Sequence, residues 1–356
     1  MSVFDKYTGK NFSESADTYN SIFAHFDSNR DGFLDLEEFG VLLEELLNNN
    51  DDCQQSLSEA DVSSLFSILD LNHDDHLSVE EFRCAWLYWI KQILSPVKAL
   101  LIIDVQNDFI TGSLSLRNCP ASQDATAVIP KINTLLEQNL FDVVVYTYDW
   151  HPDNHISFIE NVGKRAIHPS SKITAEDAKI QDKVVFEVDG TAREQILWPK
   201  HCLQNSWGAE LHPDLKVVEN AYHIYKGVNP DVDSYSAFWD NQKLSQTDLV
   251  NILKQHGVTD AYVCGLAYDV CVGFTARHAI KHGFRTVVIE DAARGVTLDG
   301  ICKTKTKLST KGIFTAETDQ VPRLVKAELR PACLANQAAF NYRQAWSIVQ
   351  ENSSLA

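Results

Sequence analysis

Three reactive side chains in the second part of this chain each follow a short apolar segment. Asp104 directly follows four apolar residues, Lys226 follows residues 221–225, and Cys271 follows residues 260–266 through a tight turn into an expected helix. A buried carboxylate is costly without a partner, and backbone N–H groups at a helix N-terminus lower a thiol pKa and can stabilise an oxyanion. Taken singly, the three residues also fit a loop acid, a surface lysine and a structural cysteine. The residues alone therefore leave a reactive thiol and a structural one both open.

A second group of residues has the types that bind transition metals. Asp149, His151 and His155 lie within seven residues of one another after the apolar segment 141–148, and His201 follows later in the chain. A carboxylate and imidazoles are common ligands of zinc and of iron, and such a set can leave coordination positions open. The sequence therefore predicts a zinc or iron site.

Two twelve-residue segments in the first part of the chain have the spacing of calcium-binding EF-hand loops, in which oxygen ligands fall at positions 1, 3, 5, 7, 9 and 12. The segments start 43 residues apart, and each lies between two stretches with helical periodicity. The ligands predicted for the first are Asp27, Asn29, Asp31, the Phe33 carbonyl, Asp35 and Glu38. Those predicted for the second are Asp70, Asn72, Asp74, the His76 carbonyl, Ser78 and Glu81.

The two loops differ at position 6, where an EF-hand turns sharply and prefers glycine. Gly32 fills this position in the first loop, whereas Asp75 fills it in the second. Aspartate tolerates the left-handed conformation better than most residues, so the second loop can still form. A calcium site and a degenerate or weak site both stay open for residues 70–81.

The charge of the chain is concentrated at its start. Residues 1–95 hold 19 Asp and Glu against 5 Lys and Arg, a net charge of −14 out of −18. This balance argues against a nucleic-acid partner and favours cation binding by the first segment.

The sequence has no features of a membrane or secreted protein. No run approaches the roughly 18 apolar residues of a membrane helix, the N-terminus is too polar for a signal peptide, and the eight cysteines are scattered. We therefore expect reduced thiols, no membrane partner, and a cytoplasmic location with the nucleus as the alternative.

The pattern of elements changes near Ser95-Pro96. Before it, helix–loop–helix units repeat, which predicts a small all-α domain over residues 1–95. After it, β-branched segments at 99–105, 141–148, 260–266 and 285–292 alternate with helical patterns at 128–138, 245–256 and 270–282. This alternation predicts an α/β fold over residues 96–356, a three-layer α/β/α sandwich around a mostly parallel, Rossmann-like sheet. Active sites in such folds lie beyond the carboxyl ends of the strands.

Residues 321–356 are expected to form one or two helices that pack on the sheet.

Five ordered motifs over about residues 97–320 resemble the nicotinamidase family, within the isochorismatase-like superfamily of cysteine hydrolases. Together with the EF-hand pair, they make the chain similar to the EF-hand-bearing nicotinamidases of invertebrate animals. The motifs are Asp104-x-x-Asn107-Asp108-Phe109, Asp149-Trp150-His151-Pro152-x-x-His155-x-Ser157-Phe158, Trp198-Pro199-x-His201-Cys202, Lys226 with Tyr235-Ser236-Ala237-Phe238, and Gly265-Leu266-Ala267-x-Asp269-x-Cys271.

The resemblance implies a role for each matching residue. Cys271 would be the nucleophile, Asp104 its general base and Lys226 the third member of a triad. The backbone N–H groups of Ala267 and Cys271 would form the oxyanion hole, next to a cis peptide at Leu266–Ala267. The metal ligands would be Asp149, His151 and His201, holding zinc, with iron or manganese as alternatives and His155 left open. The pocket would be lined by Phe109, Trp198 and Tyr235, with Leu114 a weaker candidate.

The implied activity is hydrolysis of nicotinamide to nicotinate and ammonia through a cysteine thioester, in NAD salvage. Pyrazinamide is expected to be a substrate as well, and homo-oligomerisation stays open. Two alternatives are another amidase of the superfamily and a calcium-binding regulatory protein with an inactive hydrolase domain. His151 and His201 argue against an isochorismatase-type member, and the intact set of Asp104, Lys226 and Cys271 argues against an inactive domain.

Overall fold

The computed structural model describes residues 2–47 and 58–353 of the chain, and its first part is a lobe of helices. Apolar residues at helical spacing, such as Phe39, Leu42, Leu43 and Leu46, point from α2 into one core. The elements of this lobe are α1 (Ala16–Phe26), β1 (Phe33–Leu34), α2 (Leu36–Leu47), α3 (Glu59–Leu69), β2 (Leu77–Ser78) and α4 (Val79–Ala85), which runs through a π-helical turn (Trp86–Ile90) into α5 (Lys91–Leu94).

The second part contains a six-stranded sheet in the order β10-β9-β8-β3-β4-β7, in which every neighbouring pair is parallel. Its central strands are continuous apolar runs because side chains on both faces are buried. On β3, Leu100 and Ile102 face one core while Leu101 and Ile103 face the other. The strands are β3 (Lys98–Ile103), β4 (Val143–Asp149), β7 (Tyr222–Lys226), β8 (Asp260–Leu266), β9 (Arg285–Arg294) and β10 (Phe314–Ala316).

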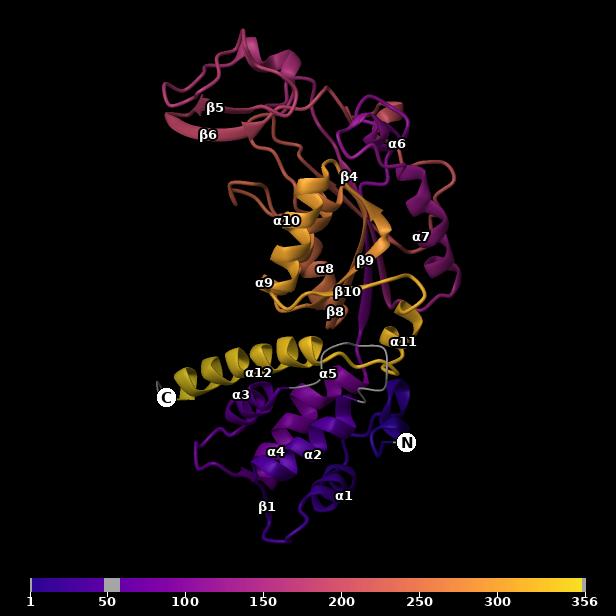
Figure 1. Cartoon of the computed structure of the whole chain (residues 1–356), viewed down its shortest axis with the longest axis vertical. Coiled ribbons are helices and arrows are strands. Elements are labelled where there is room, and N and C mark those ends of the chain that lie inside the picture. The colour runs from indigo at the N-terminus through magenta and orange to yellow at the C-terminus, as the bar shows by residue number, and fades with distance from the viewer. Residues whose placement is uncertain (1, 48–57, 354–356) are drawn as a thin grey trace.

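Helices cover both faces of this sheet, as Figure 1 shows. The apolar side chains of α7 (Val128–Glu137) and α11 (Val321–Val325) pack on one face. Those of α8 (Leu249–Gln255), α9 (Gly273–Lys281) and α10 (Leu298–Ser309) pack on the other. The predicted three-layer α/β/α sandwich, preceded by an all-α lobe, is confirmed. The predicted boundary near Ser95 falls in the segment between α5 and β3.

Two elements between β4 and β7 were not predicted. The strands β5 (Lys183–Val188) and β6 (Thr191–Ile196) form an antiparallel hairpin with its own small apolar core. This hairpin extends away from the sheet at the end opposite the helical lobe (Figure 1). A short helix, α6 (Asn107–Ile110), follows β3 at the same end.

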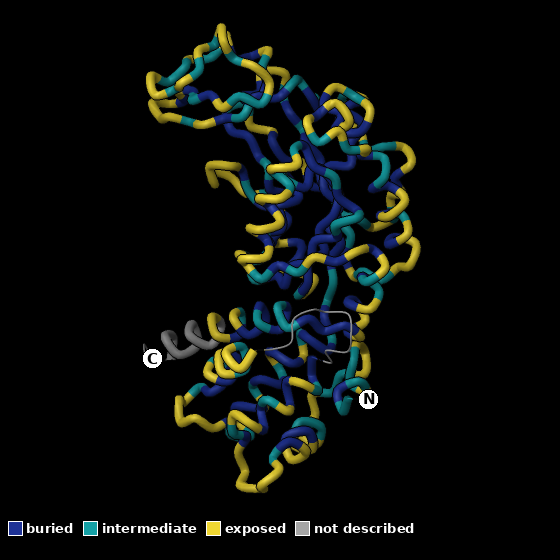
Figure 2. Tube along the Cα trace, viewed as in Figure 1, coloured by how far each residue is buried: buried dark blue, intermediate teal, exposed yellow. Residues whose placement is uncertain are grey.

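The end of the chain forms two helices, as expected, but they do not both pack on the sheet alone. The long helix α12 (Ala332–Ser353) contacts β9 and also α3 and α5 of the helical lobe. Figure 1 shows it lying between the two parts of the molecule, and Figure 2 shows buried positions along it. The expectation of a tail packed on the sheet is therefore met only in part by α12, because its apolar residues are buried in the core of the lobe.

No helix among the described residues is both long enough and apolar enough to cross a membrane.

Candidate active site

The side chains of Asp104, Lys226 and Cys271 meet at the carboxyl ends of the strands. Asp104 follows β3, Lys226 ends β7, and Cys271 follows β8. Lys226 Nζ lies 2.9 Å from Asp104 Oδ2 and 3.4 Å from Cys271 Sγ, and a carboxylate oxygen of Asp104 lies within 4.8 Å of that sulfur. Asp104, Lys226 and Cys271 are 0%, 2% and 5% exposed. The parallel topology thus brings together three polar side chains that are far apart in the sequence.

The Asp104 carboxylate is held by an unexpected partner, Thr147 of β4. The Thr147 hydroxyl donates to Asp104 Oδ1 at 2.6 Å and accepts from the Asp104 backbone N–H at 3.1 Å. Asp104 Oδ2 lies against the Lys226 ammonium, 2.9 Å away, and meets no hydroxyl or backbone N–H donor among the described residues. This second oxygen is therefore the one available to receive a proton.

The backbone around Cys271 has an unusual shape that depends on Gly265. This glycine has φ +107°, and a Cβ built on it would lie 2.2 Å from the Ile103 carbonyl oxygen. The next peptide, Leu266–Ala267, is cis, as the resemblance implied. Cys271 lies in a π-helical turn, Tyr268–Val272, ahead of α9 rather than in the first turn of that α-helix.

Burial and neighbouring charges shift the pKa values of this group in opposite senses. Burial raises the pKa of Asp104, although the Lys226 ammonium lowers it. Burial alone would lower the pKa of Lys226, but the carboxylates of Asp104 and Asp149 raise it well above its usual value. Burial raises the pKa of the Cys271 thiol well above its usual range, and Lys226 only partly opposes this. The expectation that position at a helix start lowers the thiol pKa is therefore wrong, because desolvation outweighs it.

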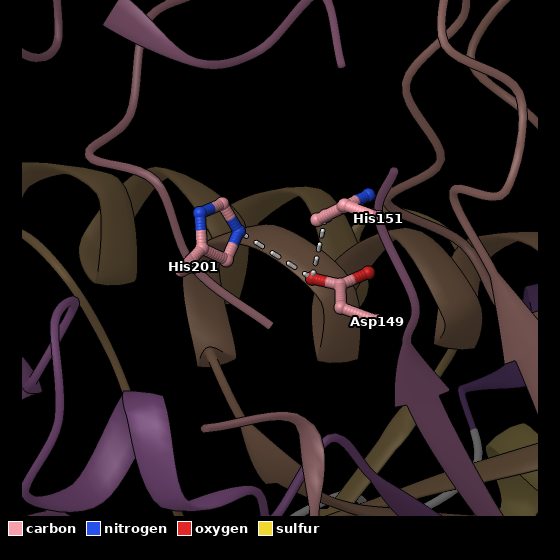
Figure 3. A group of neighbouring side chains, drawn as sticks. All are labelled: Asp149, His151 and His201. Atoms are coloured by element: carbon pink, nitrogen blue, oxygen red, sulfur yellow. Dashed lines mark ion pairs between the residues drawn. The ribbon is translucent and has the colours of Figure 1, made fainter. Parts of the chain in front are cut away.

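Asp149, His151 and His201 form a second buried group (Figure 3). It adjoins the first, because ligand atoms of Asp149, Asp104 and Cys271 lie within 4.8 Å of one another. Asp149 Oδ2 lies 3.6 Å from His151 Nε2 and 3.8 Å from His201 Nε2. Each imidazole donates from Nδ1 to a backbone carbonyl, His151 to Gly227 at 2.8 Å and His201 to Pro199 at 2.7 Å. Both Nε2 lone pairs therefore point toward Asp149, and burial lowers the pKa of His201 to about 4. Burial alone would lower the pKa of His151, but the Asp149 carboxylate raises it above its usual value. Two imidazoles oriented by backbone carbonyls next to a carboxylate are a donor set that fits a divalent metal ion, which binds the neutral form of each ring.

His155 lies beside this group. Its ring stacks on His151 with centroids 4.0 Å apart, and its Nδ1 hydrogen bonds to the Ser157 hydroxyl. His155 Nε2 is buried without a hydrogen-bond partner among the described residues. Ligand atoms of His155, His151 and Asp233 lie within 4.8 Å of one another. These three residues are a possible metal-binding set that differs from the one that contains His201.

A pocket with about 410 Å³ of empty space, including its mouth, joins the two groups of polar residues. Cys271 and Ala267 line one part of the pocket, while Asp149 and His201 line another. The three residues predicted for the pocket all line it, as does Leu114. The remaining walls are Leu116, Asp233, Val270 and Val296.

Sequence reasoning missed Asp233, a buried carboxyl in the pocket wall. Its oxygens accept from Gln195 Nε2 at 2.7 Å and from the Ser234 backbone N–H at 2.8 Å. Burial raises its pKa. The signal for it was weak, because it lies between Lys226 and Tyr235, outside the five motifs.

The two loops of the helical lobe have EF-hand geometry. Gly32 and Asp75, at position 6, both have positive φ, of 90° and 63°, so the aspartate supports the same turn. Leu34 of β1 pairs with Leu77 of β2, which joins the loops back to back. Glu38 turns both carboxylate oxygens into its own loop, and Asp27 Oδ1 is buried without a hydrogen-bond partner among the described residues. These acceptor oxygens fit a calcium ion.

Both parts of the chain match known protein families. Residues 98–308 match the isochorismatase domain family, and residues 18–87 match the EF-hand domain pair. The first match covers more than half of the chain, so this protein belongs to the isochorismatase family of hydrolases and carries an EF-hand pair in front of that domain.

Within that family its relatives include several nicotinamidases. The nicotinamidase of Escherichia coli is 37% identical over 57% of this chain and 85% of its own length. The nicotinamidase of Saccharomyces cerevisiae is 33% identical over 61% of this chain and 98% of its own. The structure of an Acinetobacter baumanii nicotinamidase pyrazinamidase superposes with a TM-score of 0.53 and 38% identity, covering 63% of this chain and 98% of that one.

Proposed function

We propose that this protein is a nicotinamidase, which hydrolyses nicotinamide to nicotinate and ammonia and also accepts pyrazinamide. The observation that carries the proposal is a pocket lined by Cys271, whose sulfur lies beside Lys226 and Asp104, and also by Asp149 and His201 of the Asp-His-His set. A flat aromatic amide fits this pocket because Phe109 and Trp198 offer apolar walls while Cys271 offers a nucleophile.

Acylation begins with removal of the thiol proton. Because burial raises the pKa of Cys271, the thiol is protonated at rest and needs a base in contact. Asp104 Oδ2 is that base, since Thr147 occupies its other oxygen. The sulfur then forms a bond to the amide carbon, and the carbon–nitrogen bond breaks as Asp104 passes the proton to the leaving nitrogen, which departs as ammonia. The backbone N–H groups of Ala267 and Cys271 hold the oxyanion.

Deacylation reverses the roles. Water loses a proton to Asp104 and attacks the thioester carbon, the carbon–sulfur bond breaks, and Cys271 recovers a proton as nicotinate forms. Lys226 compensates the negative charge that moves between Asp104 and Cys271, because its Nζ lies within 3.4 Å of both groups.

Asp149, His151 and His201 would hold the metal, for which we propose zinc, with iron or manganese as alternatives. When bound, the ion supplies a Lewis-acidic site for the pyridine nitrogen, directly or through water, and so orients the ring. The pocket contains both Asp149 and Cys271, so a ring anchored at one end presents its amide at the other.

The EF-hand pair would bind calcium through the twelve positions predicted above, with the second loop the weaker site. We also propose a cytoplasmic location for the reaction, with the nucleus as the alternative, and a role in NAD salvage.

The function is tested by ammonia release from nicotinamide, pyrazinamide and benzamide by the purified, zinc-loaded protein. We expect fast release from the first two. Benzamide lacks the ring nitrogen and should be slower by at least about tenfold in kcat/KM, because losing one polar contact costs on the order of 1.4 kcal/mol. No release from nicotinamide would contradict the proposal, and equal rates for benzamide would contradict the role of the ring nitrogen.

A further inference from the structure

One face of the C-terminal helix α12 is buried in the EF-hand lobe. Ala335, Ala338, Ala339 and Tyr342 all belong to the apolar core of that lobe, and none is more than 4% exposed. Their spacing is i, i+3, i+4, i+7. This is the pattern with which a target helix fills the hydrophobic groove of an EF-hand protein.

The lobe supplies a matching surface. The same core contains Leu65 and Phe66 of α3, together with Ile93 of α5. Trp89, in the π-helical turn before α5, donates its indole N–H to the Ala335 carbonyl at 3.0 Å and has no exposed surface. The groove that an EF-hand sensor would offer to another protein is therefore filled by a helix of this chain.

This contact touches the two segments that flank the second loop. α3 leads into the loop at Asp70, and the helical run that begins with α4 leaves it at Val79. Tyr342 shares the apolar core of the lobe with Phe82, which directly follows Glu81, the last predicted ligand of that loop. In sensor EF-hands calcium changes the angle between the two helices that flank a loop, and α12 contacts α3 and the helical run on the other side of the second loop.

The other face of α12 is hydrogen bonded to the base of the sheet. Gln337 accepts from the Thr286 backbone N–H at 2.9 Å and donates to the Gly312 carbonyl at 2.5 Å, and Asn341 donates to the Gly283 carbonyl at 2.6 Å. These contacts lie at the amino ends of β9 and β10, whereas the pocket lies at the carboxyl ends of the strands. A six-residue strand separates the two ends by about 20 Å.

We propose that α12 is the in-chain target helix of the EF-hand pair, so that calcium binding and docking of α12 stabilise each other and fasten the lobe to the base of the sheet. The coupling is reciprocal, because calcium strengthens the docking of α12 by the same factor by which docked α12 strengthens the binding of calcium. The inference rests on the calcium binding proposed above and is independent of the amidase reaction.

Hydrogen exchange of the full-length protein tests the first half of the coupling. When calcium is removed with a chelator, the amides of residues 335–342 should exchange at least about fivefold faster. A fivefold change is the lower end of typical coupling between two binding sites. Amides of β3 serve as the internal reference and should change less. Equal protection of residues 335–342 in both conditions, while calorimetry shows that calcium binds, would overturn the inference.

Two matched variants test the reverse half. Ala338→Glu places a charge on the docked face, and Gln344→Glu places the same charge on an exposed position of the same helix. Calcium affinity by titration calorimetry should fall at least about fivefold in the first variant and stay unchanged in the second. Tyr342→Ala is a milder change on the same face and should also weaken calcium binding, so it serves as the test if Ala338→Glu does not fold.

Unchanged calcium affinity in both docked-face variants would overturn the coupling, and so would absence of calcium binding to the parent protein. Nicotinamide turnover, measured alongside, shows whether the amidase proposal stands in either case.

Discussion

The Lys226 ammonium lies 2.9 Å from the Asp104 carboxylate, and neither side chain is exposed to solvent. The two residues end β7 and follow β3, strands that are separated by β4 in the sheet. The same ammonium lies 2.5 Å from Asp149 Oδ1. One cation thus offsets two buried carboxylates, one in the predicted triad and one in the predicted metal site, and this links the two halves of the pocket.

Replacing Lys226 should therefore cost both activity and stability. Lys226→Met leaves two buried carboxylates without their cation and should lower the free energy of unfolding by about 3–5 kcal/mol, with loss of turnover. Lys183→Met is the control, because Lys183 pairs with Glu194 on the surface, where such a pair contributes about 1 kcal/mol or less. Urea unfolding of both variants checks the prediction. A Lys226→Met protein as stable as the parent would show that the ammonium is not the charge that balances this site.

Loss of either histidine of the Asp-His-His set should release the metal. Loss of a residue that only supports a metal ligand costs about 10- to 100-fold in metal affinity. We expect His151→Ala and His201→Ala, which each remove a ligand, to weaken zinc binding by more than this. His168→Ala, which removes a histidine whose partner is Ser170, is the control and should keep its zinc. Metal content after dialysis, measured by mass spectrometry of the elements, gives the answer. Full zinc content in His201→Ala would remove this residue from the ligand set.

Gly265 should tolerate no side chain. Gly265→Ala combines a φ of +107° with a Cβ 2.2 Å from the Ile103 carbonyl, and we expect it to destabilise the fold by more than about 2 kcal/mol. Gly163→Ala is the matched control, since a Cβ there meets nothing within 4 Å. Thermal unfolding compares the two variants. Similar melting temperatures for both would mean that the turn before Cys271 can relax.

Acid should destabilise the protein partly through His278. Burial, followed by Lys281 and Arg277, lowers the pKa of His278 from 6.5 to about 4. Between these values the unfolded chain binds more protons than the folded chain, so the free energy of unfolding falls as the pH drops from 6.5 to about 4. His278 causes no change in the free energy of unfolding above pH 6.5 and no further change below about pH 4. His278→Gln keeps an acceptor for the Trp239 indole N–H and should lose less stability between pH 7.5 and pH 5.

Urea midpoints at the two pH values measure this effect. His25→Gln is the control, because the His25 side chain is 50% exposed, and it should behave as the parent does. Equal acid sensitivity in His278→Gln and the parent would place the destabilisation in other groups.

The sequence predicted most of the fold because its signals were local. The EF-hand spacing placed both loops, including the one with Asp75 at position 6, and continuous apolar runs predicted the central strands β3, β4, β8 and β9. The edge strands β7 and β10 and the β5–β6 hairpin were missed, since short or alternating segments lack such runs. The packing of α12 depends on contacts with helices far away in sequence, which no local pattern reveals.

The site could be predicted as a set of residues but not as a set of contacts. The resemblance named Asp104, Lys226 and Cys271, and the topology alone explains why they meet. The Thr147 hydrogen bond to Asp104 and the carboxyl of Asp233 in the pocket wall arise from neighbouring strands and a long connection, so nothing in their sequence context marked them. The thiol pKa was predicted in the wrong direction because burial cannot be read from position near a helix start.

The central claim is that Cys271 forms a thioester with the acyl group of nicotinamide. The most direct measurement is the intact mass of the protein after acid quench during turnover, for the parent and for Cys271→Ala. We predict that the parent gains one nicotinoyl group, located on Cys271 by peptide mapping, and that the variant gains none and releases no ammonia. Nicotinate formation by Cys271→Ala at the rate of the parent would contradict the account.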